Sequence, residues 1–219
     1  MSVRLSDVSY SYAPDSPAVL RNVSMDVSDG ESVAVMGPSG SGKSTLLGVM
    51  GLLLTPTSGS VAFNGRTVSG SRSRSMHRAI EVGWVFQSSN VIATRSVRDN
   101  VALPLFARSV RRRETERVVE EALGVMGLSG YGSRKGKSVS GGELQRVCIA
   151  RAIVTGPSLI VADEPTGNLD AANSSRVMTL LVSAARTRNL CLVVATHDPI
   201  VASHCTRTVW IDGNQLHVG

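Results

Sequence analysis

A short glycine- and serine-rich segment constrains the fold of this chain more than any other stretch. It has the pattern G-x-x-x-x-G-K-[ST] and lies between the apolar run Ser32–Met36 and the helix-forming run 46–50. Glycines let backbone N–H groups surround a polyphosphate, and the N-terminus of a following helix adds partial positive charge. The pattern therefore predicts a strand, a phosphate-binding loop and a helix, and with them a nucleoside triphosphate site.

Within this loop, Lys43 is predicted to reach the β- and γ-phosphates, and the Ser44 hydroxyl to bind Mg²⁺. The remaining loop residues are expected to hold the phosphates through their backbone. The predicted loop consists of Gly37, Pro38, Ser39, Gly40, Ser41, Gly42, Lys43, Ser44 and Thr45.

The bulk composition indicates an ordinary α/β protein. The chain has 219 residues with 42% hydrophobic and 4% aromatic content. Its longest apolar stretch, residues 46–54, contains two glycines and is too short to cross a bilayer. The first nine residues alternate polar and apolar side chains, unlike a signal peptide. We expect a cytoplasmic protein that acts at a membrane through a partner, with buried, reduced thiols at Cys148, Cys191 and Cys205.

Arginine clusters account for much of the net charge of +6. Such runs most often form solvated helix faces, although attraction to an anionic membrane or to nucleic acid is the alternative. The clustered residues are Arg72, Arg74, Arg108, Arg111, Arg112, Arg113 and Arg117.

The order of the predicted elements places a helical insert within an α/β core. Strands are predicted over 3–10, 19–27, 32–36, 60–63, 80–86, 159–162, 190–195 and 208–211. Helices are predicted over 97–107, 112–126, 143–154, 171–186 and 199–203. We therefore expect one domain, with a core over 1–87 and 155–219 and a helical subdomain over 88–154.

Polar residues follow several predicted strands at the sheet edge where open α/β sheets bind ligands. Asp163 fits a Mg²⁺-holding carboxylate, and Glu164 fits a general base that activates water. His197 is expected to contact the γ-phosphate and to hold that base. Gln87 is expected to reach the metal or the attacking water. The other histidines lack this context and are expected at the surface or in the core.

A second anion-binding loop precedes the helix predicted at 143–154. Ser140, Gly141 and Gly142 stand at its N-terminus, where free N–H groups bind anions. One nucleotide needs only one phosphate-binding loop. The presence of a second loop indicates that the chain also holds the nucleotide of a neighbouring subunit.

Taken in order, these motifs resemble those of ATP-binding cassette (ABC) ATPases over essentially the whole chain. Residues 37–45 resemble the Walker A loop, 159–164 the Walker B strand, and 139–143 the ABC signature. Gln87 matches the Q-loop and His197 the switch histidine, while residues 167–170 match the D-loop, which adds Asp170 to the nucleotide site. Tyr12 stands where the family stacks an aromatic residue on adenine, with Tyr10 as the less favoured candidate.

The resemblance implies a P-loop NTPase core of the ABC ATPase type, with an N-terminal antiparallel β subdomain and a helical insert. It also implies an enzyme that hydrolyses ATP with Mg²⁺ to drive transport through a separate integral-membrane permease. In this family two subunits pair head to tail, so Ser140 and Gly142 would act on the partner's ATP. Because every motif is intact, we expect a homodimer at the cytoplasmic face of the membrane and no nucleic-acid partner.

Finer features are similar to the macrolide-export, lipoprotein-release and cell-division ABC ATPases. These features are residues 162–170, 85–87 and 100–105. The chain departs from the usual pattern at Val139 and Glu143 of the signature. It also departs over 88–95, a loop that faces the permease in relatives.

Two alternative functions stay open at this point. One is an ABC ATPase that regulates a membrane complex without moving a solute, as the cell-division relatives do. The other is a non-transport ABC ATPase, although this chain lacks the coiled-coil arms or paired cassettes of those proteins. A simple P-loop kinase is disfavoured because Glu164 would direct ATP to water.

Overall fold

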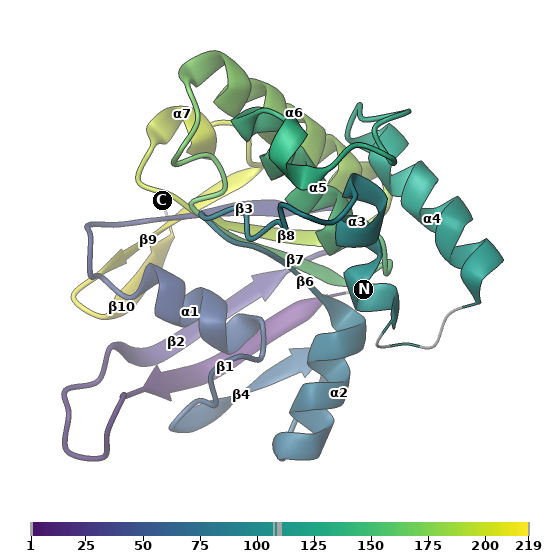
Figure 1. The fold of residues 1–219 in the computed structure, drawn as a ribbon. Helices are drawn as coiled ribbons and strands as arrows, with labels where there is room; N and C mark the ends of the chain where they lie inside the picture. Colours follow the sequence, from purple (N-terminus) through teal and green to yellow (C-terminus); the bar gives the residue numbers. More distant parts are fainter. Residues whose placement is uncertain (1, 107, 109–110, 219) are drawn as a thin grey trace.

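The chain forms two β-sheets with helices between and above them, in a computed structural model that describes residues 2–106, 108 and 111–218 (Figure 1). The larger sheet has six strands in the order β10-β9-β3-β8-β7-β6. Its strands are β3 Ser32–Met36, β6 Val82–Val85, β7 Leu159–Asp163, β8 Cys191–Ala195, β9 Arg207–Asp212 and β10 Gln215–Val218. Only β10 pairs antiparallel, with β9. Strands β3 and β8 are buried at every residue, as expected of parallel strands covered on both faces.

A four-stranded antiparallel sheet in the order β2-β1-β4-β5 forms the second layer. Its strands are β1 Val3–Tyr10, β2 Leu20–Val27, β4 Ser58–Phe63 and β5 Arg66–Thr67. Buried and exposed residues alternate along β2 from Asn22 to Val27, which fits a sheet with one covered face. This layer is the antiparallel β subdomain that the sequence predicts, so the predicted fold class is confirmed.

The glycine loop leads into α1 Lys43–Met50, which lies between the two sheets (Figure 1). Its side chains join β1, β2, β4 and the core strands in one hydrophobic cluster that includes Leu46, Leu47 and Met50. The helix is therefore fixed by burial on both sides. This packing holds the loop before it at the carboxyl end of β3.

The other face of the six-stranded sheet is covered by a group of helices (Figure 1). They are α3 Val97–Phe106, α4 Arg112–Val125, α5 Gly141–Ile153 and α6 Ala171–Thr187, with the short η1 Gly136–Ser138 and α7 Pro199–Ala202. A second hydrophobic cluster joins α3 to α6 with β6, β7 and β8. Among the described residues, no helix is both long and apolar enough to cross a bilayer.

Several predicted elements differ from the structure in detail. Residues 71–81 form helix α2 Ser71–Glu81, so the strand predicted to begin at Ile80 begins only at Val82. The strand β10 was not predicted. The helix predicted over 97–107 is α3 Val97–Phe106, and its last predicted residue lies outside the described residues. Helix α5 begins at Gly141 rather than at Glu143, which puts both signature glycines in its first turn.

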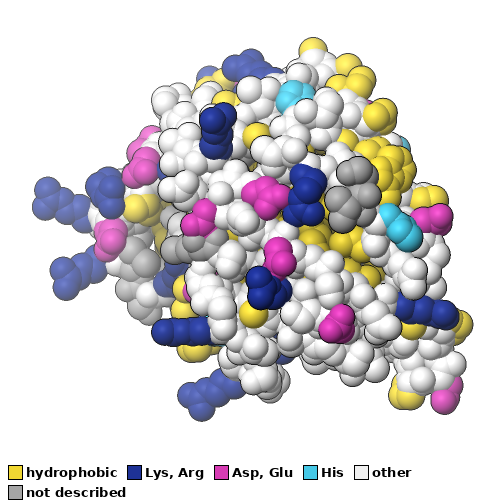
Figure 2. All heavy atoms as spheres, turned by 180° about the vertical axis from the view of Figure 1, so that it is seen from behind, with side chains coloured by type: hydrophobic (Ala, Val, Ile, Leu, Met, Phe, Trp, Pro, Cys, Tyr) yellow, Lys and Arg dark blue, Asp and Glu magenta, His cyan; other side chains and the backbone are white. Residues whose placement is uncertain are grey.

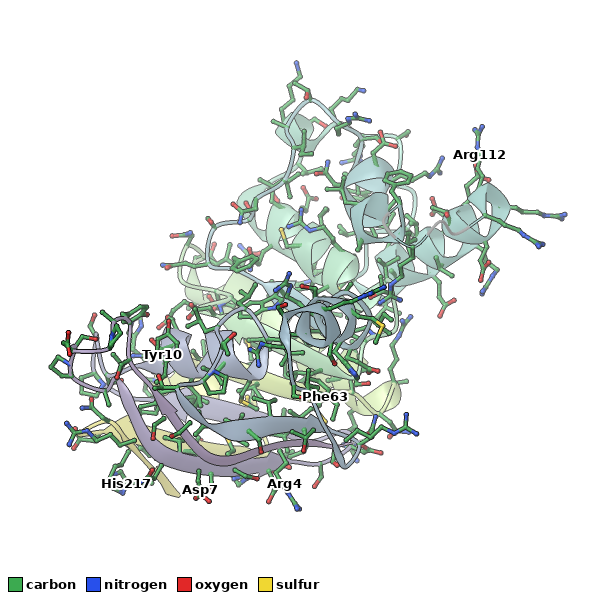
Figure 3. All side chains as sticks on the ribbon, turned by 90° about the horizontal axis from the view of Figure 1, so that it is seen from below. Arg4, Asp7, Tyr10, Phe63, Arg112 and His217 are labelled. Atoms are coloured by element: carbon green, nitrogen blue, oxygen red, sulfur yellow. The ribbon has the colours of Figure 1, made fainter. Side chains whose placement is uncertain are left out.

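The arginines fall into two groups rather than one solvated face. Arg112 is exposed and points outward at the far end of α4 (Figure 3), and Lys and Arg side chains project on that side of the molecule (Figure 2). Arg74, in contrast, is buried and donates to the carbonyl of Leu54. Burial lowers the pKa of both Arg74 and Arg108. Both side chains bond backbone carbonyls of other segments, so the prediction of a solvated helix face is wrong for them.

The sequence predicts buried, reduced thiols at Cys148, Cys191 and Cys205. All three are free thiols, with Cys148 and Cys191 buried and Cys205 half-buried. Burial raises the pKa of each thiol to about 11. Because the thiolate is the reactive form, these thiols are expected to react slowly at neutral pH.

Candidate nucleotide-binding site

The carboxyl ends of β3, β8, β7 and β6 lie at one edge of the sheet, because these strands run parallel. A pocket of about 560 Å³ opens at this edge. It brings together residues that follow four strands far apart in the sequence. They line the pocket with residues from the N-terminal segment: Tyr12, Val19, Ser39, Gly40, Gly42, Lys43, Ser44, Thr45, Gln87, Asp163, Glu164 and His197.

The glycine loop is shaped by backbone conformations and close contacts. Gly42 is the N-cap of α1 with a φ of 103°, a left-handed conformation that favours glycine. A Cβ on Gly37 would lie 2.4 Å from the carbonyl oxygen of Ile211, so only glycine fits there. Within the described residues, no side chain caps α1. The first N–H groups of the helix therefore stay open to a ligand.

Two polar groups of the loop are arranged as a phosphate site would need. The Lys43 ammonium donates to the carbonyl oxygens of Gly37 and Pro38 at 2.8 and 2.9 Å. It is thereby held above the loop, within the pocket. The Ser41 Oγ is buried and has no hydrogen-bond partner among the described residues. Of the two residues, Lys43 lines the pocket, where its ammonium would meet bound phosphate oxygens.

The two acids at the end of β7 differ in surroundings. Asp163 is the last strand residue and lines the pocket beside the glycine loop. Glu164 has a φ of 45°, unusual for a residue with a side chain, which turns it out of the strand direction. Its Oε1 lies 2.8 Å from His197 Nδ1, and its Oε2 accepts from Thr196 Oγ1 at 3.4 Å. The structure therefore joins Glu164 and His197, which the sequence separates by a helix and a strand.

Gln87 lies on the opposite side of the acids from His197 in strand order, since β6 and β8 flank β7. Its backbone carbonyl accepts from Asn168 Nδ2 at 3.2 Å, which ties the segment after β6 to the turn after β7. Ser44, Gln87 and Asp163 all line the pocket and offer a hydroxyl, an amide and a carboxylate oxygen. Oxygen donors of this kind fit Mg²⁺ and do not favour softer metals.

Tyr12 lies at the pocket mouth with 67% of its surface exposed. Its hydroxyl is 3.0 Å from Thr45 Oγ1, and Tyr10 packs edge-on against it with ring centroids 5.1 Å apart. Tyr10 itself packs against the core and does not line the pocket. Of these two tyrosines, Tyr12 is therefore the one whose ring face is available to stack on a nucleotide base.

Three predicted residues of the glycine loop, Gly37, Pro38 and Ser41, are not among those that line the pocket. Four other predicted residues do not line it either: Ser140, Gly141, Gly142 and Asp170. They lie instead at the neighbouring N-termini of α5 and α6. Asp170 is the N-cap of α6 and accepts from the backbone and the side chain of Asn173 at 2.8 and 2.7 Å. A Cβ on Gly142 would lie 3.1 Å from Asn173 Oδ1, so the two helix starts touch.

Sequence reasoning missed several residues of these two regions. Val19 lines the pocket, and Thr196 bonds the Glu164 carboxylate. Thr196 stands just before His197 at a strand end, and this position could have identified it. Tyr131 bonds Glu143 of the signature, and Asn173 joins the two helix starts. No local pattern marks either of these residues.

A phosphate loop after a central parallel strand, with a bonded acid–histidine pair across the same sheet edge, defines a P-loop nucleoside triphosphatase. The family model described as "ABC transporter" matches residues 20–167, and the chain belongs to this family. It is the ATP-binding and ATP-hydrolysing subunit of an ABC transporter, and the predictions of family, function and enzyme class are confirmed.

Curated relatives and solved structures agree with this assignment. The chain is 39% identical over 209 residues to the lipoprotein-releasing system ATP-binding protein LolD of Chromohalobacter salexigens, covering 94% of this chain and 88% of the relative. It is 42% identical over 198 residues to LolD of Geobacter metallireducens, covering 89% and 88%.

The fold is similar to a dimeric structure of MJ0796, a bacterial ABC transporter cassette, with a TM-score of 0.85 and 33% identity over 98% of this chain and 96% of that chain. It is also similar to CbiO1 from Clostridium perfringens, part of the transporter complex CbiONQ. There the TM-score is 0.91 and the identity 28%, over 99% of this chain and 86% of that chain.

Proposed function

We propose that two copies of this chain bind two Mg-ATP molecules between them and drive a permease of the lipoprotein-release type. The glycine loop of one copy and the Ser140–Gly142 loop of the other would contact the same ATP. The name of the LolD relatives supports the transported class, and the dimeric form of the similar MJ0796 cassette supports the pairing. All other groups needed for hydrolysis line one pocket of a single copy.

The proposed roles follow from the contacts in the pocket. Lys43 exchanges the carbonyls of Gly37 and Pro38 for the β- and γ-phosphates, and loop N–H groups hold the remaining oxygens. Tyr12 stacks on the adenine. Ser44, Gln87 and Asp163 would hold Mg²⁺, which offsets phosphate charge when bound. Asp170, the N-cap of α6, is proposed to belong to the nucleotide site as part of the D-loop.

Glu164 is proposed as the general base. Its Oε1 lies 2.8 Å from His197 Nδ1, and its Oε2 accepts from Thr196 Oγ1 at 3.4 Å. The carboxylate lines the pocket, where it would accept a proton from the attacking water. Oxygen from water then bonds to the γ-phosphorus as the bond to the β-phosphate oxygen breaks. His197 positions the carboxylate and is proposed to contact the γ-phosphate. The Glu164–His197 pair beside the glycine loop is the observation that carries this proposal.

A single variant tests both hydrolysis and pairing. Glu164→Gln keeps the shape of the side chain and one acceptor oxygen but removes the base. We expect ATP hydrolysis to fall at least about 100-fold while ATP binding persists. Mg-ATP is then expected to double the mass measured by light scattering after gel filtration. A mass that stays monomeric at saturating Mg-ATP contradicts the pairing, and Glu120→Gln on the exposed face of α4 is the matched control.

The permease is proposed to bind a groove on the other side of β6. This groove has a volume of about 500 Å³ and lies between α2, β6, α3 and α5. The rings of Trp84 and Phe86 stack with their centroids 5.3 Å apart. Both line the groove, together with Leu103 and Pro104 of α3. Asn90, from the loop that departs from the usual pattern, also lines it. An apolar segment of the permease fits this groove, which would hold the subunit at the cytoplasmic face of the membrane.

Affinity purification tests the permease and the transported class. Tagged Glu164→Gln protein is purified from native membranes with Mg-ATP, alongside the same protein carrying Leu103→Asp in the groove. We expect a polytopic permease with the first protein and at most a trace with the second. Recovery of a regulatory membrane complex without a transporter domain would favour the alternative function, and recovery of nucleic-acid proteins alone would overturn the proposal.

The division into subdomains follows the same reasoning. We assign 1–87 and 155–219 to the nucleotide-binding core and 88–154 to a helical subdomain within one domain. The assignment is supported by the nucleotide pocket, whose lining residues all come from the first two segments. Limited proteolysis with and without Mg-ATP tests it, with cleavage expected to concentrate around residues 88–95.

A further inference from the structure

The signature of this chain carries glutamate at position 143, where the family usually has glutamine. Both oxygens of that carboxylate are engaged. Oε2 accepts from the backbone N–H of Ser140 at 2.7 Å, and Oε1 accepts from the Tyr131 hydroxyl at 2.8 Å. In return, Ser140 Oγ accepts from the Glu143 N–H at 3.4 Å, which completes a capping box.

This arrangement fixes what Ser140 presents to its surroundings. Its Oγ uses a lone pair on the Glu143 N–H, so its hydroxyl hydrogen is left to donate elsewhere. Gly141 and Gly142 occupy the first two positions of α5, where N–H groups have no partner within the helix. The loop therefore presents several donors together, which is the pattern that a phosphate group accepts.

Tyr131 is itself held in place. It is half-buried against the helical hydrophobic cluster, and its backbone N–H donates to the carbonyl of Leu128 at 3.1 Å. The Arg134 guanidinium lies over its ring, 3.9 Å from the centroid. Bonds from the Ser140 backbone and from Tyr131 also lower the pKa of Glu143, so the carboxylate is ionised at neutral pH. A rigid side chain outside the signature thus holds the carboxylate.

We propose that Glu143 and Tyr131 are positioning residues for the phosphate of the partner subunit's ATP. Tyr131 fixes the Glu143 carboxylate, Glu143 fixes Ser140, and Ser140 with the two glycines meets the γ-phosphate. This inference rests on the proposed pairing of two copies. Neither residue touches the nucleotide pocket of its own copy, so each should affect pairing without affecting the first binding of ATP.

The test uses Glu164→Gln protein as the parent and measures the Mg-ATP concentration that gives half-maximal dimer. Tyr131→Phe removes one hydroxyl and keeps the ring packing, so it should fold normally. Since the lost hydrogen bond goes to a charged group, we expect the half-maximal ATP concentration to rise about tenfold. Glu143→Ala is expected to raise it further. Glu143→Gln keeps an oxygen for the Ser140 N–H and is expected to stay within about threefold of the parent.

Binding of a fluorescent ATP analogue to the monomer is measured for each variant and is expected to be unchanged. If Tyr131→Phe and Glu143→Ala pair at the ATP concentration of the parent, the inference is overturned. The same holds if Glu143→Gln is as weak as Glu143→Ala, or if monomer binding of the analogue weakens in parallel. If the parent itself stays monomeric, the proposed pairing fails and the inference fails with it.

Discussion

The molecule contains two loops at helix N-termini that are suited to phosphate, and they are built in opposite ways. The loop before α1 ends at Gly42 in a left-handed conformation, with no side-chain cap among the described residues. The loop before α5 ends at Ser140, in an extended conformation with a complete capping box. The first loop lies inside the nucleotide pocket, and the second lies outside it.

This difference separates two ways of ordering an anion site. The first loop depends on backbone shape, since glycine is required where it approaches Ile211 and where it enters α1. Its free donors are exposed to the pocket and are completed by ATP. The second loop is ordered by its own side chains before any ligand arrives. We expect changes to the first loop to abolish ATP binding, and changes to the second to weaken only the pairing of subunits.

The largest effect is expected for Gly37→Ala. Its Cβ would lie 2.4 Å from a backbone carbonyl of β9, so the loop must move. Overpacking of this kind costs about 1–3 kcal/mol of unfolding free energy, and ATP binding should be lost. Calorimetry and nucleotide titration measure the two effects. Gly124→Ala in α4, whose Cβ meets only Ser129 Oγ at 3.6 Å, is the control and should keep both properties.

A smaller change at the same loop is Lys43→Met, which removes the charge and keeps the length of the side chain. Hydrogen bonds to charged groups contribute about 1.5–3 kcal/mol, so ATP affinity should fall roughly tenfold to a hundredfold. The thermal midpoint without ATP should change little, because among the described residues the lysine bonds two carbonyls of its own loop and no other group. If the free energy of unfolding fell as much as the free energy of ATP binding, the lysine would serve mainly to order the loop.

At the second loop, Ser140→Ala removes the N-cap of α5. Loss of such a cap typically costs about 1 kcal/mol, which chemical denaturation can measure. Binding of ATP to the monomer should be unchanged, whereas Mg-ATP-dependent pairing in Glu164→Gln protein should weaken. Ser138→Ala, at an exposed serine that bonds only Lys135, is the matched control. If the Ser140→Ala monomer bound ATP more weakly than wild type, the expectation that the second loop affects only pairing would be wrong.

The smallest expected effect is a dependence of stability on pH at Glu143. Bonds from Ser140 and Tyr131 lower its pKa in the folded protein relative to the ordinary value of about 4.3. The ionised carboxylate therefore stabilises the fold above that value, and the contribution disappears as pH falls through the lowered pKa. Denaturation midpoints of wild type and Glu143→Gln should differ by a constant amount near neutral pH and converge below about pH 4. A constant difference down to pH 3 would contradict this.

The parts of the fold decided by neighbouring residues could be predicted from the sequence. Ser32–Met36 is a strand as predicted, since an uninterrupted apolar run before a glycine loop has few alternatives. The site residues at the ends of β7 and β8 follow from the same logic, because parallel strands end at one edge. Their assigned roles stay predictions that the variants above test.

Contacts between distant segments explain what the sequence did not reveal. Helix α2 has no buried apolar stripe and is held instead by Arg74 and Arg78, which donate to the carbonyls of Leu54 and Leu52. A polar segment with this kind of support has no recognisable period. The Tyr131–Glu143 bond likewise depends on how a loop folds back onto α5, and nothing near either residue indicates it.

Arg108, one of the clustered arginines, connects segments that are far apart in the sequence. From just beyond α3, its guanidinium donates to the carbonyls of Ala79 and Ile80 at the end of α2 and, at 3.0 Å, to the carbonyl of Thr155 after α5. One side chain thereby clamps the last turn of α2 to two segments of the helical layer. A rotation of that layer relative to α2 would have to break these bonds, and without such a break the end of α2 would move with the layer.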